Sequence, residues 1–230
     1  MKNILQEKPT DKLLGRLAAS MSFVDDYNIK DKKVLDIGCG YGWCELNFLD
    51  RGASELVGME LTESDLVTIR ENINDTRLTL VTGSAIEIPL TAQSVDTVVS
   101  WEVIEHIPKN TEAKMFSEVF RVLKPGGVFY LSTPHASFWA RFFDPAWWLI
   151  GHRHYKETKL RNLAESAGFV TDQCVRKGGW WEIVGLLNMY IAKWIFRRRP
   201  FFEYFVLHRQ DQEFKHKSGF TNIFFKFVKE

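Results

Sequence analysis

Cysteine is scarce in this sequence, with three residues in 230. Cys39 and Cys44 lie near each other, whereas Cys174 stands far along the chain, so the set cannot build a disulfide framework. No second Cys or His pair follows the first pair at the spacing of a structural zinc site, which also excludes a zinc-stabilised fold. Cysteine usage of this kind is typical of a reducing compartment, and we expect a cytoplasmic protein.

Long apolar runs are missing as well. The amino-terminal residues contain no apolar core of the length that a signal peptide needs. The most apolar segment, residues 180–196, is interrupted by Glu182, Asn188 and Lys193. A membrane-spanning helix needs about 20 predominantly apolar residues, so we expect none here.

Neither sign of charge is in excess overall, since 30 Lys and Arg stand against 29 Asp and Glu. The distribution is uneven, because residues 1–140 hold 14 basic and 20 acidic residues and residues 141–230 hold 16 and 9. The carboxyl-terminal part is also rich in Trp and Phe, a combination that favours an anionic or lipid-like partner. Residues 180–207 are therefore a candidate for peripheral contact with the inner face of a membrane. Packing of this segment on the sheet or on a second copy is the alternative, and the oligomeric state stays open.

Short apolar runs alternate with longer amphipathic segments, which predicts an α/β fold with a parallel sheet and helices on both faces. We expect strands at 33–38, 55–61, 78–83, 95–101 and 127–134, and helices at 13–27, 43–52, 62–75 and 111–127. A helix at 156–169, a helical segment at 178–207 and a strand at 221–229 follow. No repeat or linker marks a boundary, so residues 1–230 are expected to form a single domain.

Gly38, Gly40 and Gly42 follow the first strand, at the edge of the sheet where open α/β folds bind ligands. Glycine there permits a positive φ and lets a ligand lie against the main chain. A phosphate-binding loop would continue into Lys and Ser or Thr, but this turn continues into Trp and Cys. A dinucleotide fingerprint has a different glycine spacing, and Asp36 would repel a diphosphate. A turn without a ligand would leave Asp36 unexplained.

The segment VLDIGCGYG, residues 34–42, resembles the first motif of class I S-adenosylmethionine-dependent methyltransferases, which include small-molecule, quinone-precursor and sugar methyltransferases. The segments ELVGMEL, SWEVIEHIP and RVLKPGGVFYLSTP resemble further motifs in the same order. The resemblance implies a Rossmann-like, doubly wound, mostly parallel seven-stranded sheet. It places the cofactor-binding core at about 30–175, and an aromatic-rich acceptor lid with carboxyl-terminal elements at about 135–155 and 178–220. It also implies S-adenosyl-L-methionine as the cofactor and S-adenosyl-L-homocysteine as the product.

The resemblance further implies positions for the cofactor contacts. The negative charge of Asp36 suits a cationic donor, and Glu60 would accept hydrogen bonds from the ribose hydroxyls while Leu61 presses on the adenine. After the third strand the family commonly has Asp, where this sequence has Ser84. The predicted cofactor-binding residues are Asp36, Gly38, Cys39, Gly40, Glu60, Leu61, Ser84, Ala85, Ile86, Trp101 and Glu102.

Histidines are the candidates for catalysis, because an imidazole has a pKa suited to general-base work. We predict His106, just after the fourth strand, and His154 as catalytic residues, with a structural role as the alternative. His135, His152 and His154 lie close together in the sequence, which raises the question of a metal ion. No adjacent carboxylate completes a metal-binding pattern, although Asp144 is near, so we expect no metal.

The predicted function is transfer of a methyl group to a small-molecule or lipid-linked acceptor, at oxygen. A quinone precursor and a sugar of a surface polysaccharide are examples of such acceptors. Six aromatic residues within 138–148 favour a pocket for an aromatic or lipid-linked substrate. DNA is not expected as a partner, since the segment after the fourth strand has neither a Pro-Pro-aromatic motif nor a Pro-Cys nucleophile. An RNA or protein methyltransferase is the alternative within the class, and a non-catalytic module that binds S-adenosylmethionine or acts as a scaffold is the alternative outside it.

Overall fold

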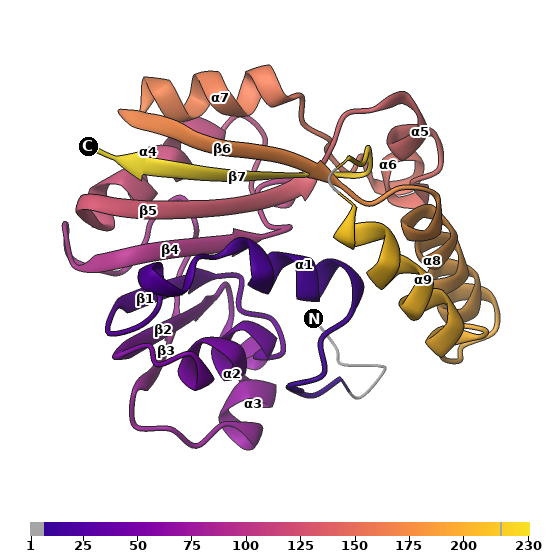
Figure 1. The fold of residues 1–230 in the computed structure, drawn as a ribbon, viewed down its shortest axis with the longest axis horizontal. Helices are drawn as coiled ribbons and strands as arrows, with labels where there is room; N and C mark the ends of the chain where they lie inside the picture. The colour runs from indigo at the N-terminus through magenta and orange to yellow at the C-terminus, as the bar shows by residue number, and fades with distance from the viewer. Residues whose placement is uncertain (1–6, 217) are drawn as a thin grey trace.

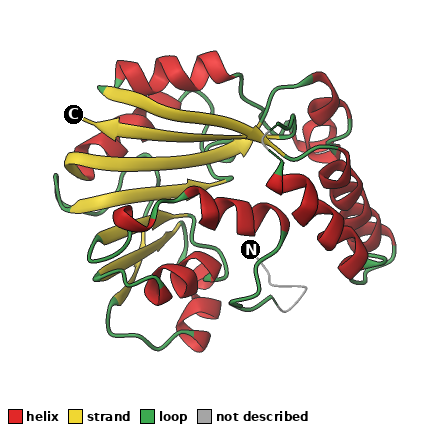
Figure 2. Ribbon diagram, in the orientation of Figure 1, coloured by secondary structure: helices red, strands yellow, loops and turns green. Residues whose placement is uncertain are grey.

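A seven-stranded sheet lies between helical layers in the computed structural model, which describes residues 7–216 and 218–230 (Figures 1 and 2). The strands are β1 (Lys33–Ile37), β2 (Glu55–Glu60), β3 (Leu78–Thr82), β4 (Val95–Trp101), β5 (Leu123–Pro134), β6 (Phe169–Lys177) and β7 (Asn222–Lys229). Their order is β3-β2-β1-β4-β5-β7-β6. The first five pair in parallel, and β7 runs antiparallel to both of its neighbours. The predicted doubly wound, mostly parallel sheet is therefore confirmed.

The sequence pattern does not predict β6, because this strand lies at the edge of the sheet and carries mostly polar side chains. An edge strand with polar and charged residues is protected against pairing with another chain, but it shows little of the apolar pattern by which strands are recognised. The strand predicted at 221–229 is confirmed as β7, and it inserts between β5 and β6.

The helices follow the predicted alternation, with three corrections, the first of which is that the helix predicted at 111–127 ends at Val122, because β5 begins at Leu123. They are α1 (Gly15–Phe23), α2 (Trp43–Asp50), α3 (Glu63–Asn72), α4 (Glu112–Val122), α5 (Phe138–Phe142), α6 (Pro145–Ile150), α7 (Glu157–Ser166), α8 (Trp180–Tyr190) and α9 (Glu203–Lys215). The helix predicted at 13–27 ends at Phe23, and a 3-10 turn, η1 (Asp26–Asn28), follows. The helical segment predicted at 178–207 is broken, because α8 runs into a π-helical turn, η2 (Ile191–Ile195), and Phe202 with φ +49° separates that turn from α9.

The two faces of the sheet are covered by different helices. Met115 and Phe116 of α4 and Leu160 of α7 pack with Leu35 and the side chains that share its face of the sheet. On the other face α1 and α2 pack, with Phe48 of α2 among the largest fully buried side chains. Because side chains alternate along a strand, Val34 and Asp36 of β1 point to the α2 side. The strand pattern thus brings a carboxyl group under the start of α2.

The carboxyl ends of the parallel strands meet at one edge of the sheet, on the right in Figure 1, where α5, α6, α8 and α9 also lie. The segments predicted to form the acceptor side are therefore at the edge where open α/β sheets bind ligands. Among the described residues, no helix combines the length and the apolar character that crossing a membrane requires.

Candidate active site

The glycine turn joins β1 to α2 in a conformation that side chains would not tolerate. Gly38, Gly40 and Gly42 all have positive φ, at +79°, +58° and +91°. A Cβ on Gly38 would come within 2.4 Å of Cγ2 of Val103, so the loop after β4 packs directly against the turn. A Cβ on Gly40 would meet nothing closer than 4.0 Å, so its main chain is bare toward open space. At Gly40 the main chain of the turn is therefore accessible to a ligand. At Gly38 the turn packs against the loop after β4.

Asp36 lies beneath this turn and is 1% exposed. Its Oδ1 has no hydrogen-bond partner among the described residues. Burial raises the pKa of Asp36 to about 7, with the negative charge of Glu60 adding to the rise and a contact with the Cys44 thiol opposing it. A buried carboxyl group with an unpaired oxygen is stabilised when a cation or a hydrogen-bond donor approaches, so Asp36 is suited to a cationic ligand.

Glu45, in the first turn of α2, is a second buried carboxyl that the sequence analysis missed. Its side chain is fully buried, and neither oxygen has a hydrogen-bond partner in the part of the chain that the structure describes. Burial and then the neighbouring Asp36 raise the pKa of Glu45 well above its usual range. The sequence does contain a signal for the burial of Glu45, because this residue lies three residues before Phe48 and four before Leu49. At that spacing all three side chains share one face of the helix, which is buried.

Glu60, at the end of β2, reaches across to the glycine turn. Its Oε1 accepts a hydrogen bond from the amide of Gly40 at 2.8 Å, and its Oε2 accepts one from the amide of Leu61 at 3.3 Å. The amides of Gly38 and Cys39 both donate to the carbonyl oxygen of Met59, which fixes the turn to β2. Cys39 is buried, and this burial raises the pKa of its thiol, so Cys39 is a neutral packing residue.

The segment after β3 is held beside Glu60. The amide of Gly83 donates to the carbonyl oxygen of Glu60 at 2.9 Å, and Ser84 pairs with Glu87 in an isolated bridge. Ala85 is buried and Ile86 is half-buried. Ser84, Ala85 and Ile86 therefore lie at the same edge of the sheet as Glu60. Leu61 is 69% exposed there, which leaves its side chain accessible to a ligand.

Trp101 and Glu102, at the end of β4, are engaged in contacts within the protein. Nε1 of Trp101 donates to Sγ of Cys44 at 3.4 Å. Oε1 of Glu102 accepts from Oγ of Ser132 at 2.6 Å, and its Oε2 accepts from Asn222 at 3.0 Å and from Arg16 at 3.1 Å. Through these hydrogen bonds Glu102 links the end of β4 to β5, β7 and α1.

The loop after β4 brings Glu105 and His106 to the acceptor side. Glu105 is buried, and its Oε2 accepts a hydrogen bond from Oγ1 of Thr133 at 2.9 Å. His106 is exposed, and its ring stacks on that of His152 with the centroids 5.1 Å apart. Partial desolvation and then the charge of His152 lower the pKa of His106, which favours the neutral imidazole that a proton acceptor requires.

Asp144 joins the two other histidines of this region. Its Oδ2 accepts from Nδ1 of His152 at 2.7 Å and from Nε2 of His154 at 2.8 Å, and its Oδ1 accepts from the amide of Ala146 at 2.9 Å. Burial alone would raise the pKa of Asp144, but the hydrogen bonds from the two histidines hold it well below its usual range. The other ring nitrogen of His154 bonds to the carbonyl oxygen of His135 at 3.1 Å. His154 thus has both nitrogens engaged, which favours a positioning role.

Arg153, between the two histidines, fastens their segment to the loop after β4. Its guanidinium donates to the carbonyl oxygen of Glu105 at 3.0 Å and to those of Ile104 and Ile107, and it forms an ion pair with Glu112 at 3.1 Å. The sequence analysis missed Arg153, because its partners lie more than 40 residues away in the chain. No local pattern indicates such a pairing.

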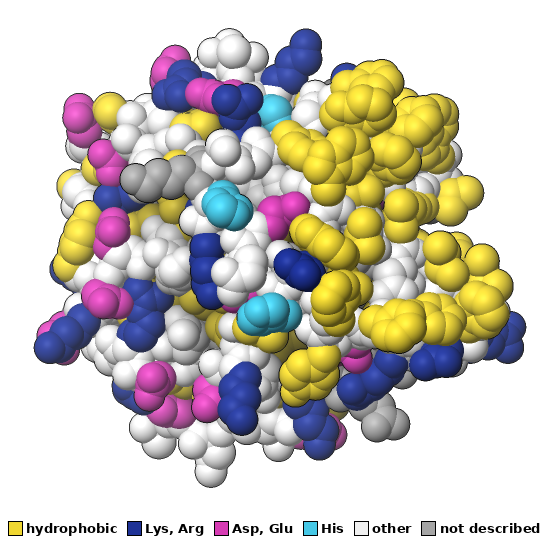
Figure 3. Space-filling view, turned by 45° about the vertical axis from the view of Figure 1, so that its right-hand side comes forward, with side chains coloured by type: hydrophobic (Ala, Val, Ile, Leu, Met, Phe, Trp, Pro, Cys, Tyr) yellow, Lys and Arg dark blue, Asp and Glu magenta, His cyan; other side chains and the backbone are white. Residues whose placement is uncertain are grey.

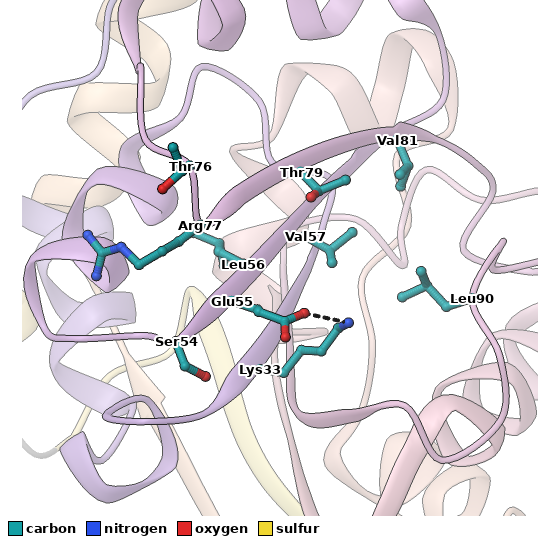
Figure 4. Close-up of a pocket in the computed structure, with 10 residues that line it drawn as sticks. All are labelled: Lys33, Ser54, Glu55, Leu56, Val57, Thr76, Arg77, Thr79, Val81 and Leu90. Carbon is teal, nitrogen blue, oxygen red and sulfur yellow. Dashed lines mark ion pairs between the residues drawn. The ribbon is translucent and has the colours of Figure 1, made fainter.

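A cavity of about 350 Å³ lies elsewhere in the fold (Figure 4). It is lined by Lys33, Ser54, Glu55, Leu56, Val57, Thr76, Arg77, Thr79, Val81 and Leu90, and an ion pair of 2.7 Å joins Lys33 and Glu55 across it. Lys33 and Glu55 are the first residues of β1 and β2, so the cavity opens around the amino ends of these strands. Since ligands of open α/β sheets bind at the carboxyl ends, we do not assign the cofactor to this cavity.

Comparison with known proteins identifies the family. Residues 34–127, which contain the glycine turn, Glu60 and the loop after β4, match the family described as a methyltransferase domain. A Mycolicibacterium smegmatis protein described as a "Probable S-adenosylmethionine-dependent methyltransferase" is 34% identical over 138 residues, 60% of this chain and 52% of that protein. Residues 34–127 thus match a methyltransferase domain, and the relatives support a class I S-adenosylmethionine-dependent methyltransferase. The predicted family is thereby confirmed, and with it S-adenosylmethionine as the cofactor of that family.

A further relative supports the methyltransferase assignment, and a solved structure shares the fold. The ubiquinone biosynthesis O-methyltransferase of Azoarcus sp. is 30% identical over 154 residues, 65% of this chain and 63% of that enzyme. The crystal structure of an S-adenosylmethionine-dependent methyltransferase from Mesorhizobium loti shares the fold, with a TM-score of 0.65, 18% identity and coverage of 92% of this chain and 96% of that one. The chain spans about half the length of the first curated relatives that it matches.

Proposed function

We propose that this methyltransferase binds S-adenosylmethionine at the glycine turn and transfers its methyl group to an oxygen atom of a small-molecule or lipid-linked acceptor. One observation carries the proposal. Asp36 and Glu60 lie at the carboxyl ends of two adjacent parallel strands, and Glu60 accepts a hydrogen bond from the bare main chain of Gly40. Two carboxylates beside exposed main chain suit a ligand that is cationic at one end and carries hydroxyl groups at the other.

The residues present fit this cofactor. The unpaired Oδ1 of buried Asp36 is an acceptor for the donor's ammonium group, directly or through water. Glu60 uses one lone pair of each oxygen on a main-chain amide and keeps others for the ribose hydroxyls. The exposed side chain of Leu61 and the segment of Ser84, Ala85 and Ile86 are placed to flank the adenine. When bound, the cofactor supplies an electrophilic methyl group on a sulfonium.

The chain's own residues then have little bond chemistry to perform. Their main tasks are to hold the acceptor oxygen in line and to exclude water. A hydroxyl acceptor must also lose its proton, and the exposed ring of His106 is available to take it. His154 acts through Asp144, which orients His152 next to His106.

The acceptor class is proposed from an apolar surface on the right of Figure 3, which includes α5 and α6, the two helices that precede His152 and His154. We define the apolar surface as the exposed large apolar side chains of α5, α6, α8, η2 and α9 with their connections: Phe138, Trp139, Phe142, Trp148, Leu149, Trp180, Val184, Ile191, Trp194, Ile195, Phe196, Phe202, Tyr204 and Phe205. Aromatic contacts join its two halves, with the rings of Trp139 and Trp180 5.5 Å apart. An exposed patch of this extent marks a binding surface.

The apolar surface favours an acceptor with a lipid tail, presented at a membrane surface. The exposed Arg197, Arg198 and Arg199 lie directly beside its η2 residues, and Figure 3 shows Lys and Arg side chains along its lower edge. Apolar side chains flanked by basic ones are the arrangement by which helices lie in the interface of an anionic bilayer. The name of the Azoarcus relative, an O-methyltransferase of ubiquinone biosynthesis, supports oxygen in a lipid-linked molecule as the acceptor.

The experiment that tests this function has two steps. Calorimetric titration with S-adenosylhomocysteine establishes the cofactor site, for which we expect one site of micromolar affinity. Incubation of the protein with methyl-labelled cofactor and fractions of a cell extract then identifies the acceptor. We expect label in the organic-soluble lipid fraction, stable to mild base as an ether is. Label confined to RNA or protein would overturn the proposed acceptor class.

A further inference from the structure

Glu105, His106 and His152 form a cluster that the proposed function uses only in part. One ligand atom from each of the three residues lies within 4.8 Å of the others. Glu105 and His106 belong to the loop after β4, and His152 belongs to the segment after α6. Two imidazoles and a buried carboxylate therefore converge from two distant parts of the chain.

We propose that this cluster binds one divalent transition-metal ion through Oε1 of Glu105, a ring nitrogen of His106 and Nε2 of His152. Two imidazole nitrogens and one carboxylate oxygen are a donor set suited to ions such as Mn²⁺, Co²⁺ and Zn²⁺. Three protein ligands leave coordination positions of the ion open. Because His106 is exposed, these open positions are accessible from solvent. An ion bound there would lower the pKa of an acceptor hydroxyl, and it would replace His106 as the group that promotes loss of the proton, because coordination uses the only lone pair of the neutral His106 ring. This role rests on the proposed function.

The unpaired oxygen of Glu105 is the observation that points to a ligand. Glu105 is 5% exposed, and its Oε1 has no hydrogen-bond partner among the described residues. Nε2 of His152 is 4.0 Å from this oxygen, which is too far for a direct hydrogen bond. Two atoms that each bind an ion at about 2.0–2.2 Å stand about 3–4 Å apart. An ion between Glu105 and His152 would satisfy both atoms with shifts of a few tenths of an ångström.

The tautomer of His152 is fixed in the form that a metal ligand requires. Its Nδ1 lies 2.7 Å from Oδ2 of Asp144, and because a carboxylate only accepts, this nitrogen carries the proton. In the neutral ring Nε2 then keeps its lone pair, on the side that faces Glu105. A carboxylate behind a ligating histidine is the usual support of a metal site, since it orients the ring and increases its basicity.

The cluster is also held in place before any ligand arrives. Arg153 fastens the segment of His152 to the main chain of the loop that carries Glu105 and His106. One ligand atom from each of Asp144, His152 and His154 also lies within 4.8 Å of the others. That group is less suited to an ion, because its members already bond to each other and to the carbonyl oxygen of His135. The structure thus favours Glu105, His106 and His152 as ligands and Asp144 as their support.

The experiment measures metal binding directly, without methyl transfer. The full chain, stripped with a chelator and dialysed, is titrated with Mn²⁺ while electron paramagnetic resonance follows the free ion, and with Zn²⁺ in a calorimeter. We expect one equivalent of either ion to bind with micromolar or tighter affinity. Glu105→Gln and His152→Ala should each weaken binding at least 100-fold, and Asp144→Asn should weaken it about 10- to 100-fold.

His208→Ala is the matched control, because it removes an exposed histidine of α9 that lies outside the cluster. It should leave the metal affinity unchanged. Each variant is accepted only if it binds S-adenosylhomocysteine as wild type does, which excludes misfolding. Absence of binding at 1 mM of either ion, or wild-type affinity in both Glu105→Gln and His152→Ala, would overturn the metal site. Retained binding of S-adenosylhomocysteine in that case would leave the proposed function standing.

Discussion

The amide of Gly40 donates a hydrogen bond to Oε1 of Glu60 at 2.8 Å, which ties the turn after β1 to the end of β2. This contact holds a carboxylate beside main chain that no side chain covers. The parallel register of β1 and β2 brings the two strand ends level, with Ile37 opposite Met59. The local geometry of the proposed cofactor site therefore follows from strand pairing and from the glycines.

We expect the affinity for S-adenosylhomocysteine to rise with pH between 6 and 8. Without ligand the pKa of Asp36 is about 7, and Glu60, Glu45 and Cys44 are the titratable groups around it. The ionised fraction of such a carboxyl rises from about 10% at pH 6 to about 90% at pH 8. Because the ammonium of the ligand favours the ionised form, the dissociation constant should fall up to about tenfold, as calorimetry at three pH values would show. Asp36→Asn should abolish this dependence, and a wild-type affinity that is flat or falls with pH would contradict the role of Asp36.

Asp36→Asn should also stabilise the protein in the absence of ligand, more so as the pH rises. The folded-state pKa of Asp36 is raised from 3.8 to about 7, so the native state holds a proton that the unfolded state releases between these values. The protonated Asp36 side chain therefore costs the folded state nothing at pH 4. As the pH rises from 4 to 7, the unfolded state is increasingly favoured by release of this proton, and the loss of stability persists above pH 7. The difference in unfolding free energy between variant and wild type, from urea denaturation, should grow to about 1–4 kcal/mol at pH 8. A difference that does not change with pH would show that Asp36 is ionised throughout.

Gly38→Ala should cost more stability than Gly126→Ala, although both glycines have a similar positive φ, +79° and +74°. The backbone strain is therefore matched, at about 1 kcal/mol in each case. A Cβ at 38 would also overlap Cγ2 of Val103, whereas a Cβ at 126 meets nothing within 4 Å. We expect the first substitution to lower the free energy of unfolding by about 2–4 kcal/mol and the second by about 1 kcal/mol. Equal costs would show that the loop after β4 does not press on the turn.

Much of this site could be predicted from the sequence, because its signals are local. Asp36 and Glu60 lie at the ends of apolar strands and the glycines follow one directly, so their position at one edge of the sheet follows from the strand pattern alone. Glu45 also had a local signal, in its spacing from Phe48. The contacts that organise the histidines had no such signal. The contacts of Asp144 with His152, and of Arg153 with the loop after β4, depend on how distant segments fold back, which no periodicity encodes.

Arg153→Met should destabilise the protein without changing the cofactor site. Methionine keeps the aliphatic stem but loses three hydrogen bonds to main-chain carbonyl oxygens and the ion pair with Glu112. We expect a loss of about 2–4 kcal/mol of unfolding free energy, because buried acceptors are left without a donor. Arg161→Met, which removes a partly exposed pair with Glu157, should cost less than about 1 kcal/mol. The affinity for S-adenosylhomocysteine should stay within about twofold, and a tenfold loss would show that Arg153 supports the cofactor site as well.

Ile195→Glu should weaken binding to anionic vesicles if the apolar surface meets a bilayer. Ile195 is 69% exposed in η2, next to the exposed Arg197–Arg199. We expect sedimentation with phosphatidylglycerol vesicles, weaker with phosphatidylcholine and reduced at high salt. The substitution should lower vesicle affinity at least fivefold, whereas Val67→Glu, at an exposed apolar residue of α3, should not. Equal behaviour of the two variants, or no binding to either vesicle, would contradict a membrane role.

Whether Glu60 binds the cofactor beside the glycine turn is measured by calorimetric titration of Glu60→Gln with S-adenosylhomocysteine. The substitution keeps the shape of the side chain and removes the charge beside Gly40. Glu63→Gln is the matched control, since Glu63 is an exposed acid three residues away that pairs with Arg70. We expect micromolar binding to wild type and to Glu63→Gln, and an affinity at least tenfold lower for Glu60→Gln. Wild-type affinity in Glu60→Gln, or no binding to the wild-type protein at 1 mM ligand, would contradict this role of Glu60.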